Sequence, residues 1–247
     1  MILKDKVAII TGSSRGIGAA LALEFAREGA SVVVSGATRI ERAREVAEKI
    51  EKLGGKALIA MADVSDKDQV DVMVDKTIQA FGRVDILVNN AGNSAFERFR
   101  EAKEETWDKI YAVHVKGAFY CIRAVIEHMV KQKSGRIINV SSPSALQGGY
   151  ALSAYATAMG GIISLTKDLA REFARYKITV NCVLPTANSE MFESFKTIPG
   201  FYERIVSEHL LGIPEPEDVA PLFAFLASDG ARFITGQVIH AGGYYIG

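Results

Sequence analysis

Residues 7–18 read VAIITGSSRGIG, a short apolar run that stops at a glycine-rich turn. The apolar run is typical of a buried strand, and the segment from Gly16 to Glu28 has the spacing of an amphipathic helix that Gly29 ends. In this order the turn lies where unpaired backbone amides and the helix dipole attract an anion such as phosphate. The spacing GxxxGxG is a weak motif by itself, but its position between a strand and a helix favours nucleotide binding over a purely structural turn.

The alternation of strand and helix continues along the chain. We expect further strands at residues 31–35, 57–60, 86–89, 136–140 and 179–183, and further helices at residues 40–53, 67–81, 104–128 and 155–176. Such an order predicts βαβ units, a parallel sheet and helices on both faces of it. With no linker or repeat in 247 residues, we expect one domain over residues 1–247. The irregular segment at residues 185–214 is long enough to be functional, and residues 186–214 are interpreted as a substrate lid.

The composition limits the classes of ligand. Lys and Arg total 29 and Asp and Glu total 29, so no net positive charge attracts nucleic acid or an anionic membrane, and a small molecule is the expected partner. Cys121 and Cys182 lie far apart without a CxxC motif, so neither a disulfide framework nor a metal site is predicted. No apolar run is long enough for a signal peptide or a membrane span, and we expect a cytoplasmic protein.

Four motifs together resemble the classical short-chain dehydrogenase/reductase family, in particular its 3-oxoacyl reductases. They are TGSSRGIG at residues 11–18, the pair Asp63-Val64, NNAG at residues 89–92, and the separation of thirteen residues between Ser142 and Tyr155. The resemblance covers nearly the whole chain and implies a single-domain, Rossmann-like, doubly wound parallel sheet of about seven strands. It also implies that the cofactor is held by Gly12, Ser14, Arg15, Gly16, Ile17, Gly18, Arg39, Asp63, Val64, Asn90, Ala91, Gly92 and Tyr155. By the same resemblance the protein is expected to be a homo-oligomer, a tetramer or a dimer, whose long helices pack across two-fold axes.

The residues after the second strand bear on the choice of cofactor. Relatives that prefer NAD carry an acidic residue there, which binds the adenosine ribose, whereas this chain reads SGATR at residues 35–39. No carboxylate therefore repels a 2′-phosphate, and the guanidinium groups of Arg15 and Arg39 match phosphate geometry. We expect NADP(H) to be favoured over NAD(H), the alternative being that both arginines are solvated surface charges.

The catalytic set lacks one member. In the family a serine and a tyrosine act on the substrate oxygen, at positions that Ser142 and Tyr155 match, and a lysine four residues after the tyrosine lowers its pKa. Here that position is Met159, whose thioether carries no charge. A unit charge about 5 Å away, at an effective dielectric of about 20, contributes roughly 3 kcal/mol, or about two pKa units of phenol acidity. We therefore expect ordinary dehydrogenase catalysis to be severely weakened.

A second departure lies in the preceding helix, where relatives place an asparagine that orders water near the lysine. This chain has His114 instead. Because imidazole titrates near pH 6.5, His114 is a candidate proton donor or substitute cation beside Tyr155. The alternative is an ordinary helix histidine held by packing and one hydrogen bond.

The segment at residues 186–214 carries apolar side chains that a lid would turn toward a ligand, namely Met191, Phe192, Phe195, Ile198, Phe201, Tyr202, Leu210 and Leu211. Phe96, Phe99 and Tyr150 are candidates for the same pocket. These residues predict an apolar substrate or substrate portion.

Three functions remain open on this sequence. The first is an NADP(H)-dependent oxidoreductase acting on an alcohol or ketone, with Ser142, Tyr155 and His114 as its catalytic residues. The second is a catalytically silent relative that binds a nucleotide. The third is a reaction without hydride transfer, such as elimination or dehalogenation, which the intact glycine turn makes the least favoured.

Overall fold

A computed structural model describes residues 1–197 and 200–243 of the chain. Its strands form one parallel sheet in the order β3-β2-β1-β4-β5-β6-β7. The expected fold, a doubly wound Rossmann-like sheet of seven strands, is thereby confirmed. The strands are β1 (Val7–Ile10), β2 (Ser31–Val34), β3 (Lys56–Ile59), β4 (Ile86–Asn89), β5 (Gly135–Val140), β6 (Ile178–Pro185) and β7 (Val238–Ala241).

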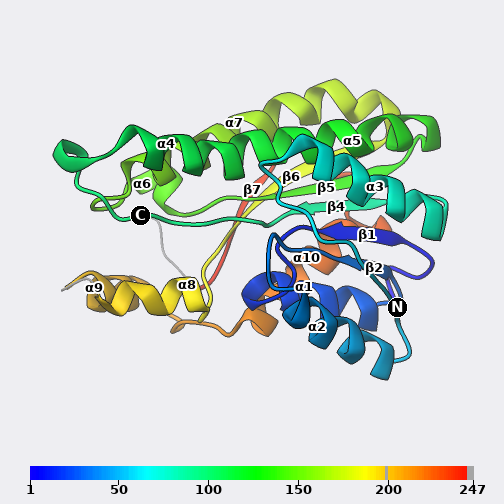
Figure 1. Cartoon of the computed structure of the whole chain (residues 1–247), viewed down its shortest axis with the longest axis horizontal. Helices are drawn as coiled ribbons and strands as arrows, with labels where there is room; N and C mark the ends of the chain where they lie inside the picture. Colours follow the sequence, from blue (N-terminus) through cyan, green and yellow to red (C-terminus); the bar gives the residue numbers. More distant parts are fainter. Residues whose placement is uncertain (198–199, 244–247) are drawn as a thin grey trace.

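Helices cover both faces of the sheet (Figure 1). On one face lie α3 (Lys67–Phe81), α4 (Glu104–Tyr111), α5 (Gly117–Gln132) and α7 (Ser153–Phe173), and on the other lie α1 (Gly16–Arg27), α2 (Ile40–Lys52) and α10 (Pro216–Ala227). Three short helices, α6 (Ser144–Gln147), α8 (Glu190–Glu193) and α9 (Phe201–Glu208), lie toward one end of the molecule, with α6 apart from α8 and α9. In the described part of the chain, no helix is long and apolar enough to cross a membrane.

Alternating side chains of each central strand serve the two layers. Ile10 of β1 packs with Phe25 of α1 and Phe223 of α10, whereas the adjacent Ile9 packs on the other face with Met73 of α3 and Ile122 of α5. Successive side chains of a strand point to opposite faces, so a strand covered on both sides must be apolar throughout. All four residues of β1 are accordingly buried.

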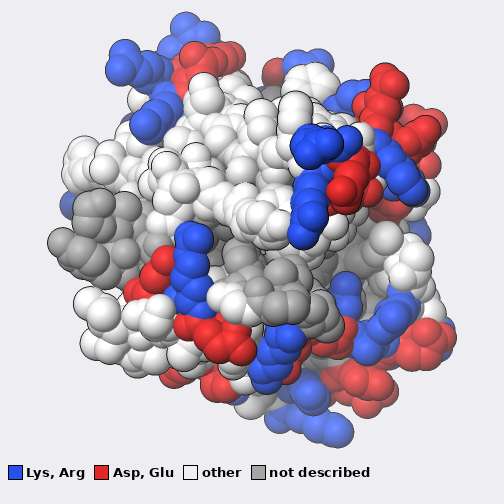
Figure 2. Space-filling view, turned by 90° about the vertical axis from the view of Figure 1, so that its left-hand side faces the viewer, with Lys and Arg blue, Asp and Glu red and all other residues white. Residues whose placement is uncertain are grey.

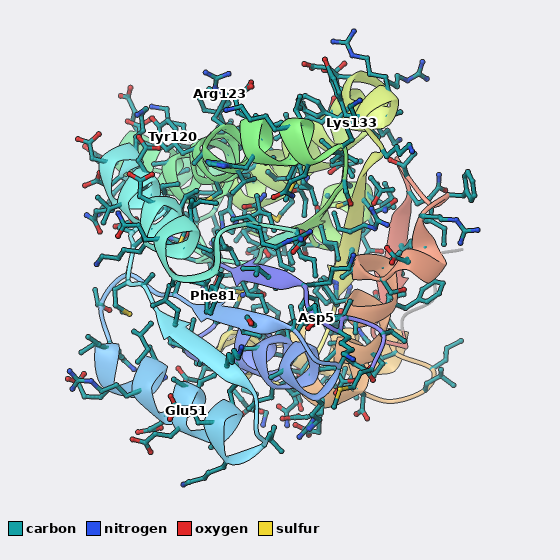
Figure 3. The ribbon with its side chains drawn as sticks, turned by 90° about the vertical axis from the view of Figure 1, so that its right-hand side faces the viewer. Asp5, Glu51, Phe81, Tyr120, Arg123 and Lys133 are labelled. Carbon is teal, nitrogen blue, oxygen red and sulfur yellow. The ribbon has the colours of Figure 1, made fainter. Side chains whose placement is uncertain are left out.

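The two ends of the sheet differ. Figure 3 views the end at which the strands begin, and its labels mark Asp5 ahead of β1, Glu51 in α2, Phe81 at the end of α3 and Lys133 after α5. The helices end and the strands begin at this side, because each crossover in a parallel sheet returns the chain to the end at which the strands begin. The carboxyl ends of the strands therefore meet at the opposite side, where ligands bind in open α/β sheets.

Two sequence predictions need correction. The helix expected at residues 104–128 runs to Gln132 and is interrupted, because α4 and α5 are joined by a π-helical turn at Ala112–Lys116. The segment expected to be irregular contains α8, α9 and a 3₁₀ turn at Ser194–Thr197. The helix α10 and the short α6 were not predicted.

Candidate active site

A cleft of about 860 Å³ opens at the carboxyl ends of the strands. Figure 2 views the molecule from this side and shows a broad uncharged area with Lys, Arg, Asp and Glu gathered around it. The structure brings all the site residues singled out in the sequence to this cleft. They are Gly12, Ser14, Arg15, Gly16, Ile17, Gly18, Arg39, Asp63, Val64, Asn90, Ala91, Gly92, His114, Ser142 and Tyr155, with Met159 beside them.

The glycines of the turn after β1 are required by close backbone approaches. A Cβ on Gly18 would lie 2.3 Å from the carbonyl oxygen of Gly12, and one on Gly12 would lie 2.8 Å from Cα of Ala91. Gly16 differs, because its φ is +53° but a Cβ there would meet nothing nearer than Cβ of Ser189 at 3.7 Å. Gly12 and Gly18 therefore hold the turn together, whereas Gly16 keeps the mouth of the cleft open.

The turn leaves the start of α1 free for a ligand. Arg15 is the N-cap residue of α1, and no side chain caps the helix. The first amides of a helix have no partner within it, and they favour an anion together with the helix dipole. With the close backbone approaches of the glycines, the chain fits the phosphate portion of a dinucleotide here.

The loop after β4 is fastened to the glycine turn. The Asn90 side-chain amide donates to the carbonyl oxygen of Thr11 at 2.9 Å, and the backbone amides of Asn90 and Ala91 both donate to the Thr11 hydroxyl at 3.0 Å. These contacts fix the loop across the switch point between β1 and β4. The loop thereby holds a defined position at the middle of the cleft.

Tyr155 and Ser142 come from different elements. Ser142 follows the end of β5, and Tyr155 lies in the first turn of α7. Burial raises the pKa of the Tyr155 phenol, and the Ser142 hydroxyl offsets only part of this effect through a hydrogen bond. The neutral phenol is therefore the favoured form of Tyr155 near pH 7.

Met159 lies one turn after Tyr155 and is only 1% exposed. It packs with Ala118, Ile162 and Leu184, while its carbonyl oxygen accepts a hydrogen bond of 2.9 Å from the Ser141 hydroxyl. The thioether thus completes an apolar cluster at the place where a cation would lower the pKa of the phenol. Nothing in this cluster compensates for the missing charge.

His114 lies in the π-helical turn and faces Tyr155, with ring centroids 5.3 Å apart and the rings nearly perpendicular. Its Nε2 lies 2.8 Å from the carbonyl oxygen of Asn93 and 3.2 Å from the Asn93 amide nitrogen. The shorter contact favours Nε2–H as donor, which leaves Nδ1 as an acceptor.

Burial lowers the pKa of His114, although its contact with Asn93 acts in the opposite direction. Desolvation disfavours the charged imidazolium, so His114 is neutral near pH 7. The lowered pKa therefore argues against His114 as a substitute cation, and its role stays a prediction. The geometry suits a neutral imidazole that accepts or donates a proton.

The cations at the other end of the cleft differ in part from those expected. Arg15 contacts the carboxylate of Glu190, and so does Arg42, whose Nη1 lies 2.6 Å from Oε1. Arg39 lines the cleft and is exposed. The sequence reasoning missed Arg42, whose position in the first turn after β2 is a usable signal, and Glu190, whose partners lie 148 and 175 residues away.

The apolar wall is smaller than predicted. Met191, Phe192 and Phe195 line the cleft, and Phe96 packs edge-on against Phe195 with ring centroids 5.3 Å apart. Tyr202 does not line the cleft but packs against Phe192 of the wall, at a centroid distance of 5.6 Å. Ile198 and the side chain of Phe201 lie outside the described residues.

Four of the expected wall residues are instead exposed to solvent and do not line the cleft: Phe99, Tyr150, Leu210 and Leu211. Leu152 and Ile205, which were not predicted, lie in the wall. Part of the predicted apolar wall thus lines the cleft, together with polar residues such as Gln147 and Glu208.

Comparisons with known proteins agree with this geometry. The family model described as short chain dehydrogenase matches residues 6–197. The chain is 40% identical over 245 residues to the (2S)-[(R)-hydroxy(phenyl)methyl]succinyl-CoA dehydrogenase subunit BbsD of Thauera aromatica, covering 98% of this chain and 97% of that protein. It is 39% identical over 248 residues to a 3-oxoacyl-[acyl-carrier-protein] reductase FabG of Staphylococcus aureus, covering 98% of both chains.

A FabG of Thermotoga maritima is also 39% identical, over 241 residues and 97% of both chains. By name these relatives are all oxidoreductases, and the matches extend over nearly the whole chain. With a glycine turn, a fastened loop after β4 and a serine and tyrosine at one cleft, the chain belongs to the short-chain dehydrogenase family.

Proposed function

We propose that this protein binds NADP(H) along the cleft and interconverts an alcohol and a ketone of apolar character. The observation that carries the proposal is the convergence of the glycine turn, the loop after β4, Ser142 and Tyr155 on one cleft of about 860 Å³. Arg15 and Arg42 supply cations beside the adenosine end, and no acidic side chain follows β2 there. Both features favour a cofactor that carries a 2′-phosphate.

The names of the relatives suggest a narrower substrate class. One name describes a secondary alcohol on a coenzyme A thioester, and the other describes a ketone on an acyl chain held by a carrier protein. We propose that the substrate is likewise a hydroxyacyl or oxoacyl thioester. The wall of Met191, Phe192 and Phe195 suits its acyl portion.

In the proposed mechanism the bound nicotinamide supplies or accepts the hydride. The Ser142 hydroxyl donates a hydrogen bond to the substrate oxygen and polarises it. The Tyr155 phenol donates its proton to that oxygen during reduction and accepts it back during oxidation. His114, neutral and fixed by Asn93, presents Nδ1 as an acceptor that would share the proton with Tyr155.

A second candidate function is a nucleotide-binding protein without turnover. The observation that favours it is the apolar surrounding of Met159, which leaves Tyr155 with a raised pKa and with no cation beside it among the described residues. Both functions require the protein to bind a nucleotide, so a test of turnover after binding separates them.

The experiment is a titration followed by a turnover assay. NADPH fluorescence is measured on adding protein, and the bound cofactor is then exposed to acetoacetyl-CoA, a longer 3-oxoacyl-CoA and simple ketones. Oxidation of NADPH with the thioesters supports the oxidoreductase, and binding without oxidation supports the second candidate. No binding of either NADPH or NADH would remove both.

We also propose a homo-oligomer in the cytoplasm. Members of the family commonly form oligomers, and Phe119 on the outer face of α5 is half exposed. Cys121 and Cys182 are buried free thiols, which suits a reducing compartment. Small-angle scattering of a dilute solution tests the assembly, and a monomer there would contradict it.

A further inference from the structure

Two arginines at the adenosine end of the cleft share one carboxylate. Arg15 belongs to the glycine turn and Arg42 to the first turn of α2, and both contact Glu190 of α8. Nη1 of Arg42 lies 2.6 Å from Oε1, while Nη1 of Arg15 contacts Oε2. Each oxygen of the carboxylate is therefore held by one guanidinium, an arrangement that also suits an anion with more oxygens.

The contact joins two walls of the cleft. Glu190 comes from the segment between β6 and α10, and α8 lies beside the start of α1 (Figure 1). All three residues line the cleft, so the shared carboxylate lies within the volume that a ligand at this end would enter. A ligand phosphate that used both arginines would have to remove Glu190 first.

The contact is also weak enough to be exchanged. The side chains of Arg15 and Glu190 are each 54% exposed, and exposed ion pairs contribute little to stability. Hydrogen bonds from Arg42 and then Arg15 lower the pKa of Glu190, so the carboxylate stays ionised. A phosphate monoester carries more charge, about −1.5 to −2 at pH 7, and three acceptor oxygens.

We propose that Glu190 is a specificity-determining residue that occupies the two-arginine site in place of a 2′-phosphate. The inference rests on the proposed binding of a dinucleotide, and it names a residue that sets the preference between NADP(H) and NAD(H). NADP(H) must displace Glu190 from Arg15 and Arg42, whereas NAD(H) leaves it in place. Glu190 thereby reduces a preference for NADP(H) that the arginines alone would create, and it holds α8 against the glycine turn until the phosphate arrives.

Glu190→Gln tests the rule, because it removes the charge and keeps the shape. Calorimetric titration of the variant should give NADPH binding tighter by about 5-fold or more, the lower end of typical coupling between competing interactions, with NADH changed by less than about 2-fold. Adenosine 2′-monophosphate should follow NADPH, and adenosine 5′-monophosphate should follow NADH. Equal or weaker NADPH binding in the variant, with NADH unchanged, would overturn the proposal.

Glu193→Gln is the matched control. Glu193 ends the same short helix, pairs with Lys196 at 2.6 Å and does not line the cleft. Its substitution should leave the affinities for NADPH and NADH unchanged. A gain in NADPH affinity as large as that of Glu190→Gln would mean that only the net charge of the segment matters, and it would overturn the proposal.

A measurement without cofactor separates this inference from the proposed function. Trypsin cleavage after Arg204, which lies in α9 of the same segment, reports how firmly α8 and α9 are held. Cleavage should be faster in Glu190→Gln than in the wild type, and adenosine 2′-monophosphate should speed it in the wild type only. If neither dinucleotide binds but cleavage still differs in this way, the proposed function fails and the Glu190 contact stands. Equal cleavage rates would overturn the contact itself.

Discussion

The two ends of the cleft tolerate change to different degrees. At the glycine turn the backbone makes the site, since a Cβ on Gly18 would lie 2.3 Å from a carbonyl oxygen. At the catalytic end side chains make the site, and Met159 belongs to one apolar cluster with Ala118, Ile162 and Leu184. A substitution that displaces the backbone of the glycine turn therefore removes the whole binding site. Catalysis built on side chains can be removed one group at a time while the fold stays intact.

The largest effect is expected from Gly16→Asp. This position has φ of +53°, which aspartate tolerates better than most residues, and open space around its Cβ, so the variant should fold. Its carboxylate would lie at the uncapped start of α1 and repel phosphate. Fluorescence titration should detect no NADPH binding, with circular dichroism as the control for folding. Unchanged affinity in a folded variant would remove the glycine turn from the site.

A smaller effect is expected from Met159→Lys at the other end. An ammonium one turn from Tyr155 should lower the phenol pKa and raise ketone reduction by about 10-fold or more, given roughly 3 kcal/mol of charge interaction less the penalty for its burial. Methionine and lysine have similar unbranched stems, so the packing around residue 159 should survive. Steady-state assays with 3-oxoacyl-CoA near pH 7 measure the gain.

The double variant Met159→Lys with His114→Asn should exceed the single one, because the asparagine restores the residue pair of the relatives. Met159→Leu is the matched control and should leave the rate unchanged. The wild type could instead turn over rapidly, with Met159→Lys slowing the reaction and His114→Ala abolishing it. That result would show that proton transfer depends on His114, and it would contradict a nucleotide-binding protein without turnover.

The pH profile of the wild type sharpens the same comparison. Because burial raises the Tyr155 pKa above its usual value of about 10, the phenolate is scarce below that pH. The value of kcat/KM for alcohol oxidation should therefore rise about tenfold per pH unit through pH 9 with no plateau. In Met159→Lys the rise should occur about two units lower. A plateau below pH 8 in the wild type would assign the base to another group.

The smallest effect concerns stability. His114 has a lowered pKa in the folded protein, so as pH falls below about 6.5 the unfolded chain binds a proton before the folded one does. The free energy of unfolding should therefore decrease from about pH 7 toward pH 5, with His240 contributing in the same direction. Urea titrations at several pH values should give a flatter dependence for His114→Asn. If the free energy of unfolding depended on pH equally in His114→Asn and in the wild type, a group other than His114 would cause the dependence. His128→Asn serves as the control.

Much of the fold was predictable because the apolar runs and helical spacing are local. The strand at residues 86–89 and the helix at residues 67–81 have the predicted bounds. The break at residues 112–116 was not predictable, since a π turn shifts the helix without altering its hydrophobic pattern. The helix α10 begins at Pro216 with a capping box, a signal that was present and not used.

The site was predictable where a motif fixes a distance along the chain. Ser142, Tyr155 and Met159 are placed by spacing and the helical turn, and the structure brings them to one cleft. The contact between Glu190 and Arg42 could not be predicted in this way, because no local sequence pattern relates the two residues. The charge state of His114 also required the structure, since burial and not sequence position lowers its pKa.

The His114 imidazole occupies the space that a side chain at Gly92 would need. A Cβ on Gly92 would lie 2.5 Å from Cε1 of the imidazole. A side chain at residue 92 would therefore require the imidazole to shift from its hydrogen bond with Asn93, and a smaller residue at 114 would relieve the clash. The two positions are epistatic, so the order of substitution matters: a change at 114 has to precede one at 92. A library that varies residue 92 in the histidine background should return glycine almost alone, whereas the same library on His114→Ala should also return alanine and serine.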